Sequence, residues 1–273
     1  MNVITKEYYI AYFDILGYKS FFEDKDNDIN EFLNYNIKLV KDIINKTTQN
    51  TMLFNYPFTL KMFSDNFVIM VENNQNIGEY RIVKVLSYLL AILQLHFLEK
   101  YKILIRGVVT KGEAYVNDQL IFGEGLIRAV DREAYANFPR IIIDKDRIQK
   151  SVCDDLCEYC IMIDEDEEYY INFFDILGMG IGNDEEFMEN EEKHLSILKD
   201  NITMLVKKYG KYDRRVTDKS RLNIADKTIS KYVWLLSKFN NYCQITYEEY
   251  KISYKLTLYY KLMKCEIEIA DVE

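Results

Sequence analysis

The chain has 273 residues, of which 49% are hydrophobic and 14% aromatic, enough to bury the core of one large or two smaller domains. Its 35 Lys and Arg against 44 Asp and Glu give a net charge of −9, which disfavours a protein that grips nucleic acid through clustered cations. Two His are too few for a His-rich metal site, and five Cys without a visible export signal predict reduced thiols and a cytoplasmic location. The most apolar stretch, residues 82–98, is interrupted by polar residues and is too short to span a bilayer, so no membrane partner is expected.

The first half of the chain is predicted to alternate strands and helices. Runs rich in Tyr, Ile, Phe and Val predict strands, and apolar positions three to five residues apart predict helices. The expected strands are 8–15, 58–62 and 66–71 around Ser64-Asp65, 103–110 and 114–122 across 111–113, and 140–144. The expected helices are 18–47, 80–101 and 123–137.

The second half is predicted to be mainly helical, with helices over 195–209 and 224–240. Its acidic runs at 164–168 and around 183–193 are interpreted as solvated surface. The pentapeptide Phe13-Asp-Ile-Leu-Gly17 recurs as Phe174-Asp-Ile-Leu-Gly178, and we interpret the second copy as a strand that ends in a turn.

Asp14 and Asp65 are the strongest candidates for a functional site. Each lies in an apolar strand context, where a carboxylate is costly to bury without a partner. Two strand-end carboxylates that converge would suit Mg²⁺ or Mn²⁺, because these hard cations take oxygen ligands and leave positions for phosphates. Spacing alone leaves open the alternative of two aspartates that cap turns.

The residues around both aspartates resemble class III nucleotidyl cyclases. Phe13-Asp14-Ile15-Leu16-Gly17-Tyr18 resembles the opening motif of that family, and Phe63-Ser64-Asp65-Asn66 resembles its second metal aspartate. Residues 105–112 followed by 121–125 resemble its later hairpin and the Gly that opens the next helix. The sequence is also similar to the sequences of the pyrimidine cyclases of bacterial antiphage signalling (Pycsar). The matching positions are Arg106-Gly107, Gly112-Glu113, Phe122-Gly123 and Ala136-x-x-Pro139-Arg140-Ile141. The resemblance covers about residues 8–145.

The resemblance implies a fold and a mechanism. The fold would be α/β (α+β), with a cyclase-type catalytic domain at 1–150, built on an antiparallel sheet with packed helices, and a mainly helical extension at 151–273. Two Mn²⁺ or Mg²⁺ ions per site would be held by Asp14, Asp65 and the Ile15 carbonyl. A nucleoside triphosphate would be cyclised in a homodimer with two composite sites. The product would act on a separate effector in antiphage defence.

The resemblance also implies residues that bind substrate. Gly17, Phe63 and Arg106 would contact it, Lys61 lies at a base-reading position, and Leu120 stands where an adenine-specific cyclase has a hydrogen-bond acceptor. A leucine cannot accept that bond, which favours a pyrimidine, UTP before CTP. A purine cyclase with atypical base contacts and a catalytically silent nucleotide-binding or dimerisation module remain alternatives.

Four arginines have roles that the sequence leaves open. The positions of the family's transition-state Asn and Arg hold Ile127 and Asp131, so the neighbouring Arg128 and Arg132 are the catalytic candidates. Arg106 and Arg140 are candidates for phosphate contact or for the dimer interface, and a structural ion pair is the alternative for each.

Two weaker signals have structural interpretations. Cys153-x₃-Cys157-x₂-Cys160 has the spacing of a radical S-adenosylmethionine cluster site, but too few residues follow it for the barrel of such enzymes, so a helix with incidental thiols is expected. His96 and His194 lack partners at ligand spacing and are interpreted as packed or surface residues.

Overall fold

The computed structural model describes residues 4–18, 58–73, 76–179, 191–209 and 219–252, with isolated positions between 32 and 45. The strands are β1 (Lys6–Leu16), β2 (Phe58–Phe63), β3 (Asn66–Glu72), β4 (Leu104–Val116), β5 (Ile121–Phe122), β6 (Ile141–Ile143), β7 (Ile161–Ile163) and β8 (Tyr169–Ile171). The helices are α3 (Glu79–His96), α4 (Glu124–Glu133), α5 (Lys150–Leu156), α6 (Ile176–Met179), α8 (Glu191–Tyr209) and α9 (Lys219–Thr246). Shorter turns of helix are η1 (Phe97–Tyr101), η2 (Ala134–Ala136) and η3 (Glu248–Tyr250).

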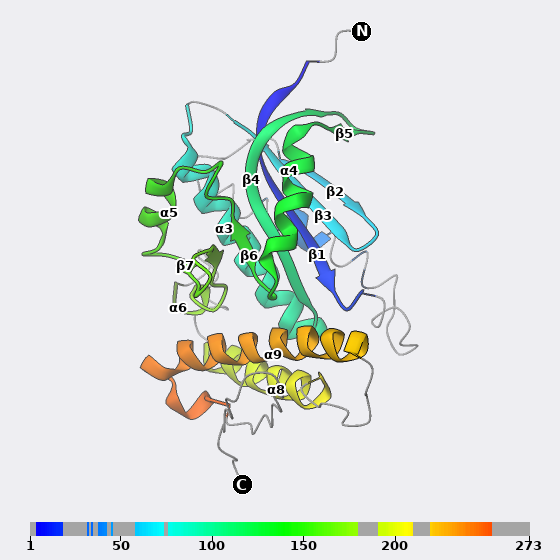
Figure 1. Ribbon diagram of the computed structural model, residues 1–273. Coiled ribbons are helices and arrows are strands. Elements are labelled where there is room, and N and C mark those ends of the chain that lie inside the picture. Colours follow the sequence, from blue (N-terminus) through cyan, green and yellow to red (C-terminus); the bar gives the residue numbers. More distant parts are fainter. Residues whose placement is uncertain are drawn as a thin grey trace. The chain divides into compact units, whose positions relative to one another are not determined.

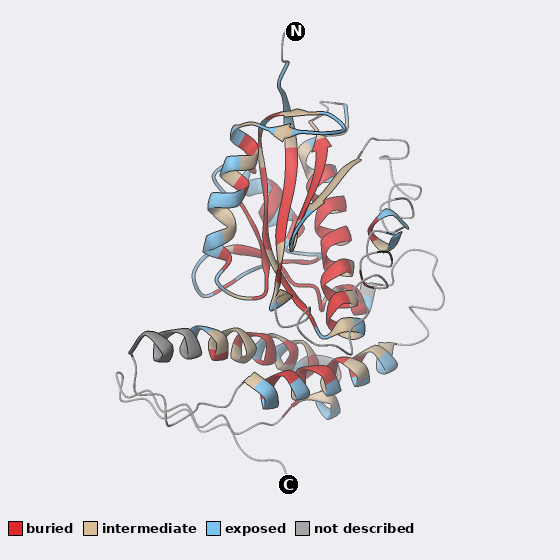
Figure 2. Ribbon diagram, turned by 90° about the vertical axis from the view of Figure 1, so that its right-hand side faces the viewer, coloured by how far each residue is buried: buried red, intermediate tan, exposed pale blue. Residues whose placement is uncertain are grey.

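One sheet organises the first part of the chain. Its strand order is β2-β3-β1-β4-β6-β8-β7, and β5 pairs with the end of β4. Every pairing is antiparallel except the parallel pair β4–β6. Helices α3 and α4 lie on opposite faces of this sheet (Figures 1 and 2). The mixed α/β fold with a mainly antiparallel sheet agrees with the sequence prediction.

Contacts divide the chain into two compact units. The first comprises Met1–Phe97 and Ile103–Met188, and the second comprises Leu98–Lys102 and Glu189–Glu273. The division therefore falls near residue 188 rather than at the expected residue 150, because β7 and β8 complete the sheet of the first unit. In the second unit α8 packs on α9, as the mainly helical prediction expects.

Helix α3 is the core helix of the first unit. The segment Glu79–Tyr101 is long and apolar enough to cross a membrane, but 78% of its most apolar window is buried inside the protein. Ile82, Leu86 and Leu89 have no exposed surface. The apolarity of this helix is therefore explained by packing inside the first unit.

Strand β4 differs from the predicted strand pair. A turn was expected at residues 111–113, but the strand runs through them, with Lys111 opposite Tyr9 and Glu113 opposite Glu7. Gly112 serves close packing: a Cβ at this position would lie 2.6 Å from the Cα of Gly125 in α4. The turn lies later, between β4 and β5.

The second pentapeptide copy is also not a strand. Residues 173–175 form a turn that leads into α6, and the rings of Phe173 and Phe174 pack 4.3 Å apart. The first copy lies in β1, between two hydrogen-bonded neighbours. The two identical pentapeptides thus adopt different structures, because tertiary contacts supply strand partners to the first copy only.

Asp175 is a largely buried carboxylate in that turn. It accepts a hydrogen bond from Asn172 Nδ2 at 2.7 Å, yet burial raises its pKa to about 6. A carboxyl whose pKa is raised on folding stabilises the protein at low pH, and this contribution is lost as pH rises from about 4 through about 6. We expect Asp175→Asn to stabilise the protein at pH 8 by about 1–3 kcal/mol and to have little effect at pH 4. Urea unfolding of both proteins across this range measures the difference, and equal gains at both pH values would contradict it.

Candidate active site

Asp14 and Asp65 meet at one end of the sheet. Asp14 lies near the end of β1, opposite Asn66 at the start of β3. Asp65 lies in the tight turn between β2 and β3, where its carbonyl accepts a 3.0 Å hydrogen bond from the Ile15 N–H. The structure therefore brings together the two aspartates that the sequence places 51 positions apart.

Two neighbours that sequence reasoning missed orient Asp65. Asn66 Nδ2 donates to Asp65 Oδ1 at 3.1 Å, and the Tyr12 hydroxyl donates to Asn66 Oδ1 at 2.6 Å. Burial and then the charges of Glu133, Asp14 and Asp65 raise the pKa of Tyr12, so it is a protonated donor at neutral pH. Strand alternation could have identified Tyr12, because residues i and i+2 face the same side of a sheet.

Arg106 and Glu133 complete the charged cluster around Asp14. Arg106 faces Asp14 across β1 and β4, and its Nε and Nη2 lie 3.4 and 3.2 Å from the two Asp14 carboxylate oxygens. Arg106 Nε also contacts Glu133 Oε1 of α4. Glu133 was not predicted, although it continues the row of Gly125 and Ala129, both buried, at four-residue spacing.

The surroundings of Glu133 are strongly electronegative. Burial, followed by the negative charge of Asp14, raises the pKa of Glu133 to about 7. The nearby Arg106 cation lowers this pKa but does not cancel the other effects. Glu133 also hydrogen-bonds the Asp14 side chain, so Asp14, Glu133 and Arg106 form one compact charged cluster.

The residues of this site fit a hard divalent cation. Asp14 and Asp65 offer carboxylate oxygens, the backbone beside them offers carbonyl oxygens, and Arg106 already occupies Asp14 as a cation. In the described part of the chain no three His, Cys, Asp or Glu side chains form a group that could hold a metal by themselves. Two carboxylates are nevertheless enough for Mg²⁺, which keeps several waters and binds substrate phosphates.

The two predicted base-reading positions lie near each other. Lys61 Nζ on β2 donates to the Asp118 carbonyl in the turn between β4 and β5. The side chain of Asn117 shapes this turn by accepting the N–H groups of Gln119 and Leu120 at 2.9 and 2.7 Å. Leu120 is 51% exposed, so its side chain is free for contact with a ligand or a second chain.

The other predicted substrate contacts lie close to the aspartates. Phe63 ends β2 just before the turn of Asp65 and is exposed, with its ring centroid 6.4 Å from that of Tyr12. Gly17 follows β1 with φ of +81°, a backbone conformation that favours glycine. Both flank the site, and their contacts with substrate stay a prediction.

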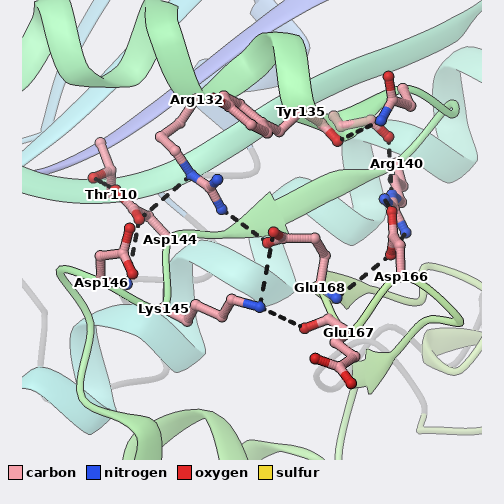
Figure 3. A network of polar contacts seen from close by, with 12 residues as sticks. Thr110, Arg132, Tyr135, Arg140, Asp144, Lys145, Asp146, Asp166, Glu167 and Glu168 are labelled. Atoms are coloured by element: carbon pink, nitrogen blue, oxygen red, sulfur yellow. Dashed lines mark hydrogen bonds and ion pairs between the residues drawn. The ribbon is translucent and has the colours of Figure 1, made fainter.

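Arg128 and Arg132 contact a different carboxylate. Arg128 Nε and Nη2 each donate to Asp144 at 2.8 Å, and Arg132 Nε lies 3.5 Å from the same side chain. Figure 3 shows Arg132 between Asp144 and Glu168. Its Nη2 donates a hydrogen bond to Glu168 at 2.8 Å. Burial raises the pKa of Asp144, but hydrogen bonds from Arg128 and Thr110 outweigh it and the net shift is downward. The catalytic role of both arginines stays a prediction.

The expected solvated run at 164–168 is instead partly structural. Arg140 is fully buried and contacts Asp164, and its Nε donates to the Ala136 carbonyl at 2.9 Å. It also contacts Asp166, beside which it lies in Figure 3. Arg132 holds Glu168 in the same run. The alternative of a structural ion pair for Arg140 is therefore correct, and the run was misread because its partners come from distant residues.

The cysteines and the two histidines form no ligand set in the described residues. Cys153 and Cys160 are buried, Cys157 is exposed, and all three are free thiols. Burial raises the pKa of Cys153 and of Cys160 to about 12, which disfavours thiolate ligands. His194 Nδ1 contacts Glu99 Oε1 at 2.7 Å in the second unit. Only Cys153 lies within α5, because the helix ends at Leu156 and Cys157 and Cys160 lie in the turn that follows, so the expected helix carries one of the three thiols.

Similar solved structures include two that are named as nucleotidyl cyclases and one that is named as a cyclase-like ATP-binding protein. The adenylyl cyclase CyaB from P. aeruginosa is 15% identical, with a TM-score of 0.44, and the match covers 63% of this chain and 96% of that one. An adenylate/guanylate cyclase/hydrolase from Silicibacter pomeroyi is 13% identical, with a TM-score of 0.40 over 62% and 95% of the two chains. A class III adenylyl cyclase-like ATP-binding protein from Pseudomonas aeruginosa is 11% identical, with a TM-score of 0.37 over 62% and 38%. No protein-family model and no curated protein sequence matches the chain.

Proposed function

We propose that this chain is a class III nucleotidyl cyclase that converts UTP or CTP to the 3′,5′-cyclic monophosphate and pyrophosphate. The observation that carries the proposal is the convergence of Asp14 and Asp65 beside Arg106, with the two strand ends joined through the Ile15–Asp65 backbone hydrogen bond. Two neighbouring carboxylates at one end of the sheet suit a reaction on a polyphosphate, in which little covalent chemistry falls to the protein.

The chain's own residues would divide the work as follows. Asp14, Asp65 and the Ile15 carbonyl would hold two divalent ions, Mn²⁺ or Mg²⁺, which when bound acidify the 3′-hydroxyl and neutralise the triphosphate. Asn66, held by Tyr12, keeps the Asp65 carboxylate oriented. Positioning of this kind can supply a large part of a rate enhancement.

The base preference rests on Lys61 and Leu120. A donor beside an apolar side chain suits a carbonyl of the base and offers no partner to the amino group of adenine. Uracil has two carbonyls and no amino group, which places UTP before CTP. A site whose polar groups match one base rejects the others, because a mismatch leaves buried groups unpaired.

A homodimer is supported by an apolar surface on one continuous stretch. Leu120, Phe122, Ile127 and Val130 are each between 45% and 65% exposed, and the outward side of α4 is visible in Figure 2. An outward side that carries exposed apolar side chains is typical of protein interfaces. Composite active sites across this face would place residues of α4 from one chain beside the aspartates of the other.

We expect Ile127→Glu to convert the dimer to a monomer. A carboxylate buried in an apolar interface without a partner should weaken association at least about a hundredfold. Light scattering at micromolar concentration measures the mass, and Met204→Glu on α8, 40% exposed, is the matched control that should leave it unchanged. A wild-type protein that is monomeric and fully active would contradict the composite site.

The deciding experiment is kcat/KM for UTP, CTP, ATP and GTP at one Mn²⁺ concentration. Preference for a pyrimidine is expected. A tenfold preference for ATP or GTP would show that the chain is a purine cyclase. Nucleotide binding without turnover would show that it is a catalytically silent nucleotide-binding module. The engagement of Arg128 and Arg132 by Asp144 favours the silent module as the second candidate, because it occupies the arginines proposed for the transition state.

The cellular role follows from the resemblance in sequence to Pycsar cyclases at Arg106-Gly107, Phe122-Gly123 and Pro139-Arg140-Ile141. On this basis the enzyme would act in the cytoplasm, and its product would activate a separate effector in antiphage defence. Accumulation of a cyclic pyrimidine nucleotide in phage-infected cells that express the chain, and not in uninfected ones, tests this role.

A further inference from the structure

Arg106 occupies the Asp14 carboxylate that a divalent ion would need. Its guanidinium lies 3.4 and 3.2 Å from the two oxygens of the Asp14 carboxylate, one contact to each oxygen. A divalent ion that takes this carboxylate must displace those contacts. The distances exceed the 2.7–2.9 Å usual for charge-assisted hydrogen bonds, so the arginine holds Asp14 loosely.

Glu133 offers Arg106 a second carboxylate partner, at the same Nε that faces Asp14. Its Oε1 contacts Arg106 Nε, and the side chains of Arg106, Asp14 and Glu133 are only 22%, 19% and 13% exposed. A guanidinium released from Asp14 in such a partly buried place would be costly unless another carboxylate kept it paired. Glu133 lies on α4, not on the strands that carry the aspartates, so it can keep the arginine while Asp14 changes partner.

We propose that Arg106 is a resident counter-ion that competes with the divalent ion for Asp14, and that Glu133 is the acceptor that retains Arg106 when the ion binds. The inference rests on the proposed function, since it takes Asp14 and Asp65 as metal-binding residues. It assigns Glu133 a positioning role that acts through Arg106. The device would keep the charge near Asp14 balanced both before and after metal binding.

Binding of Mn²⁺ without nucleotide tests the proposal, measured at pH 8 by the electron paramagnetic resonance signal of free Mn²⁺. We expect Arg106→Gln to tighten Mn²⁺ binding about tenfold or more, because it removes both a competitor and a nearby positive charge. Arg106→Lys keeps the charge but loses the two-point contact, so an intermediate affinity is expected. Arg147→Gln, which removes an exposed arginine paired with Glu124, is the matched control and should leave the affinity unchanged.

A double-mutant cycle separates positioning from direct ligation. Glu133→Gln should weaken Mn²⁺ binding at least threefold with Arg106 present, and clearly less in the Arg106→Gln protein. Equal weakening in both backgrounds would mean that Glu133 acts directly on the ion or on Asp14, which it also contacts, and it would overturn the proposal. Unchanged or weaker binding in a folded Arg106→Gln protein would overturn it as well.

The Mn²⁺-binding results would differ between a failure of the counter-ion role of Arg106 and a failure of the proposed metal site. Mn²⁺ binding that Asp65→Asn abolishes, but that does not respond to Arg106, would overturn the counter-ion role and leave the metal site standing. Absence of binding that depends on Asp65 in both wild type and Arg106→Gln would overturn the metal site and the counter-ion role together. Circular dichroism and the melting temperature of each variant establish that the protein compared is folded.

Discussion

Replacing Asp65 by Asn is expected to reduce cyclase turnover about a thousandfold or more while the protein remains folded. The carboxylate lies in a turn, is only partly buried, and makes its described side-chain contact with Asn66, so an amide of the same shape fits the same place. The charge that would hold a divalent ion is lost, and such ions contribute several kcal/mol to stabilising the transition state. Asp14→Asn should have an effect of the same size.

Single-turnover assays with UTP and Mn²⁺ measure the effect, and melting curves measure the fold. Asp155→Asn, which removes an exposed carboxylate on α5, is the matched control and should retain full activity. An Asp65→Asn protein that keeps a tenth of the wild-type rate would show that the two-metal assignment is wrong.

Replacing Arg140 by Met should produce the largest loss of stability among the ion pairs described here. Arg140 is completely buried and its partner Asp164 is 4% exposed, so the substitution removes the buried cation that faces this carboxylate. Breaking a buried pair by removing one partner typically costs about 3–5 kcal/mol. Methionine keeps much of the side-chain volume, which limits the contribution from a cavity.

Urea unfolding at pH 7 measures this cost. Arg147→Met is the matched control, because its ion pair with Glu124 is exposed, and a change within about 0.5 kcal/mol is expected there. Asp164→Asn in the Arg140→Met protein should recover part of the stability by removing the buried negative charge. A loss below 1 kcal/mol for Arg140→Met would indicate that Asp164 is solvated in the folded protein.

Local pattern was enough to identify most regular elements. Alternating and apolar runs identified β1, β2 and β3, and helical spacing identified α3, α8 and α9, because burial on one face imposes these periods directly on the sequence. The expected helix over 18–47 lies mostly outside the described residues, and those described at 38–42 are helical. The pairing of Asp14 with Asp65 was also foreseeable, since both lie where apolar strands end.

Glycine was the main source of error in the strands. Gly112 was interpreted as part of a turn between two strands, because glycine often marks turns. Its actual role is to let β4 approach Gly125 of α4, where a Cβ would clash with backbone. A glycine needed for close packing and one needed for a turn look the same in one sequence, because the neighbour that distinguishes them is remote.

The sequence by itself determined the mixed α/β fold class and the mainly helical second unit and singled out the two aspartates, because each depends on local periodicity or on a carboxylate at the end of an apolar strand. The tertiary structure alone decided which charges meet. It placed Glu133 beside Asp14 and Arg106, engaged Arg128 and Arg132 with Asp144, and buried Arg140 against the run at 164–168. An ion pair between residues far apart in the chain depends on how strands and helices are brought together, and charged side chains carry no periodic signal of their partners.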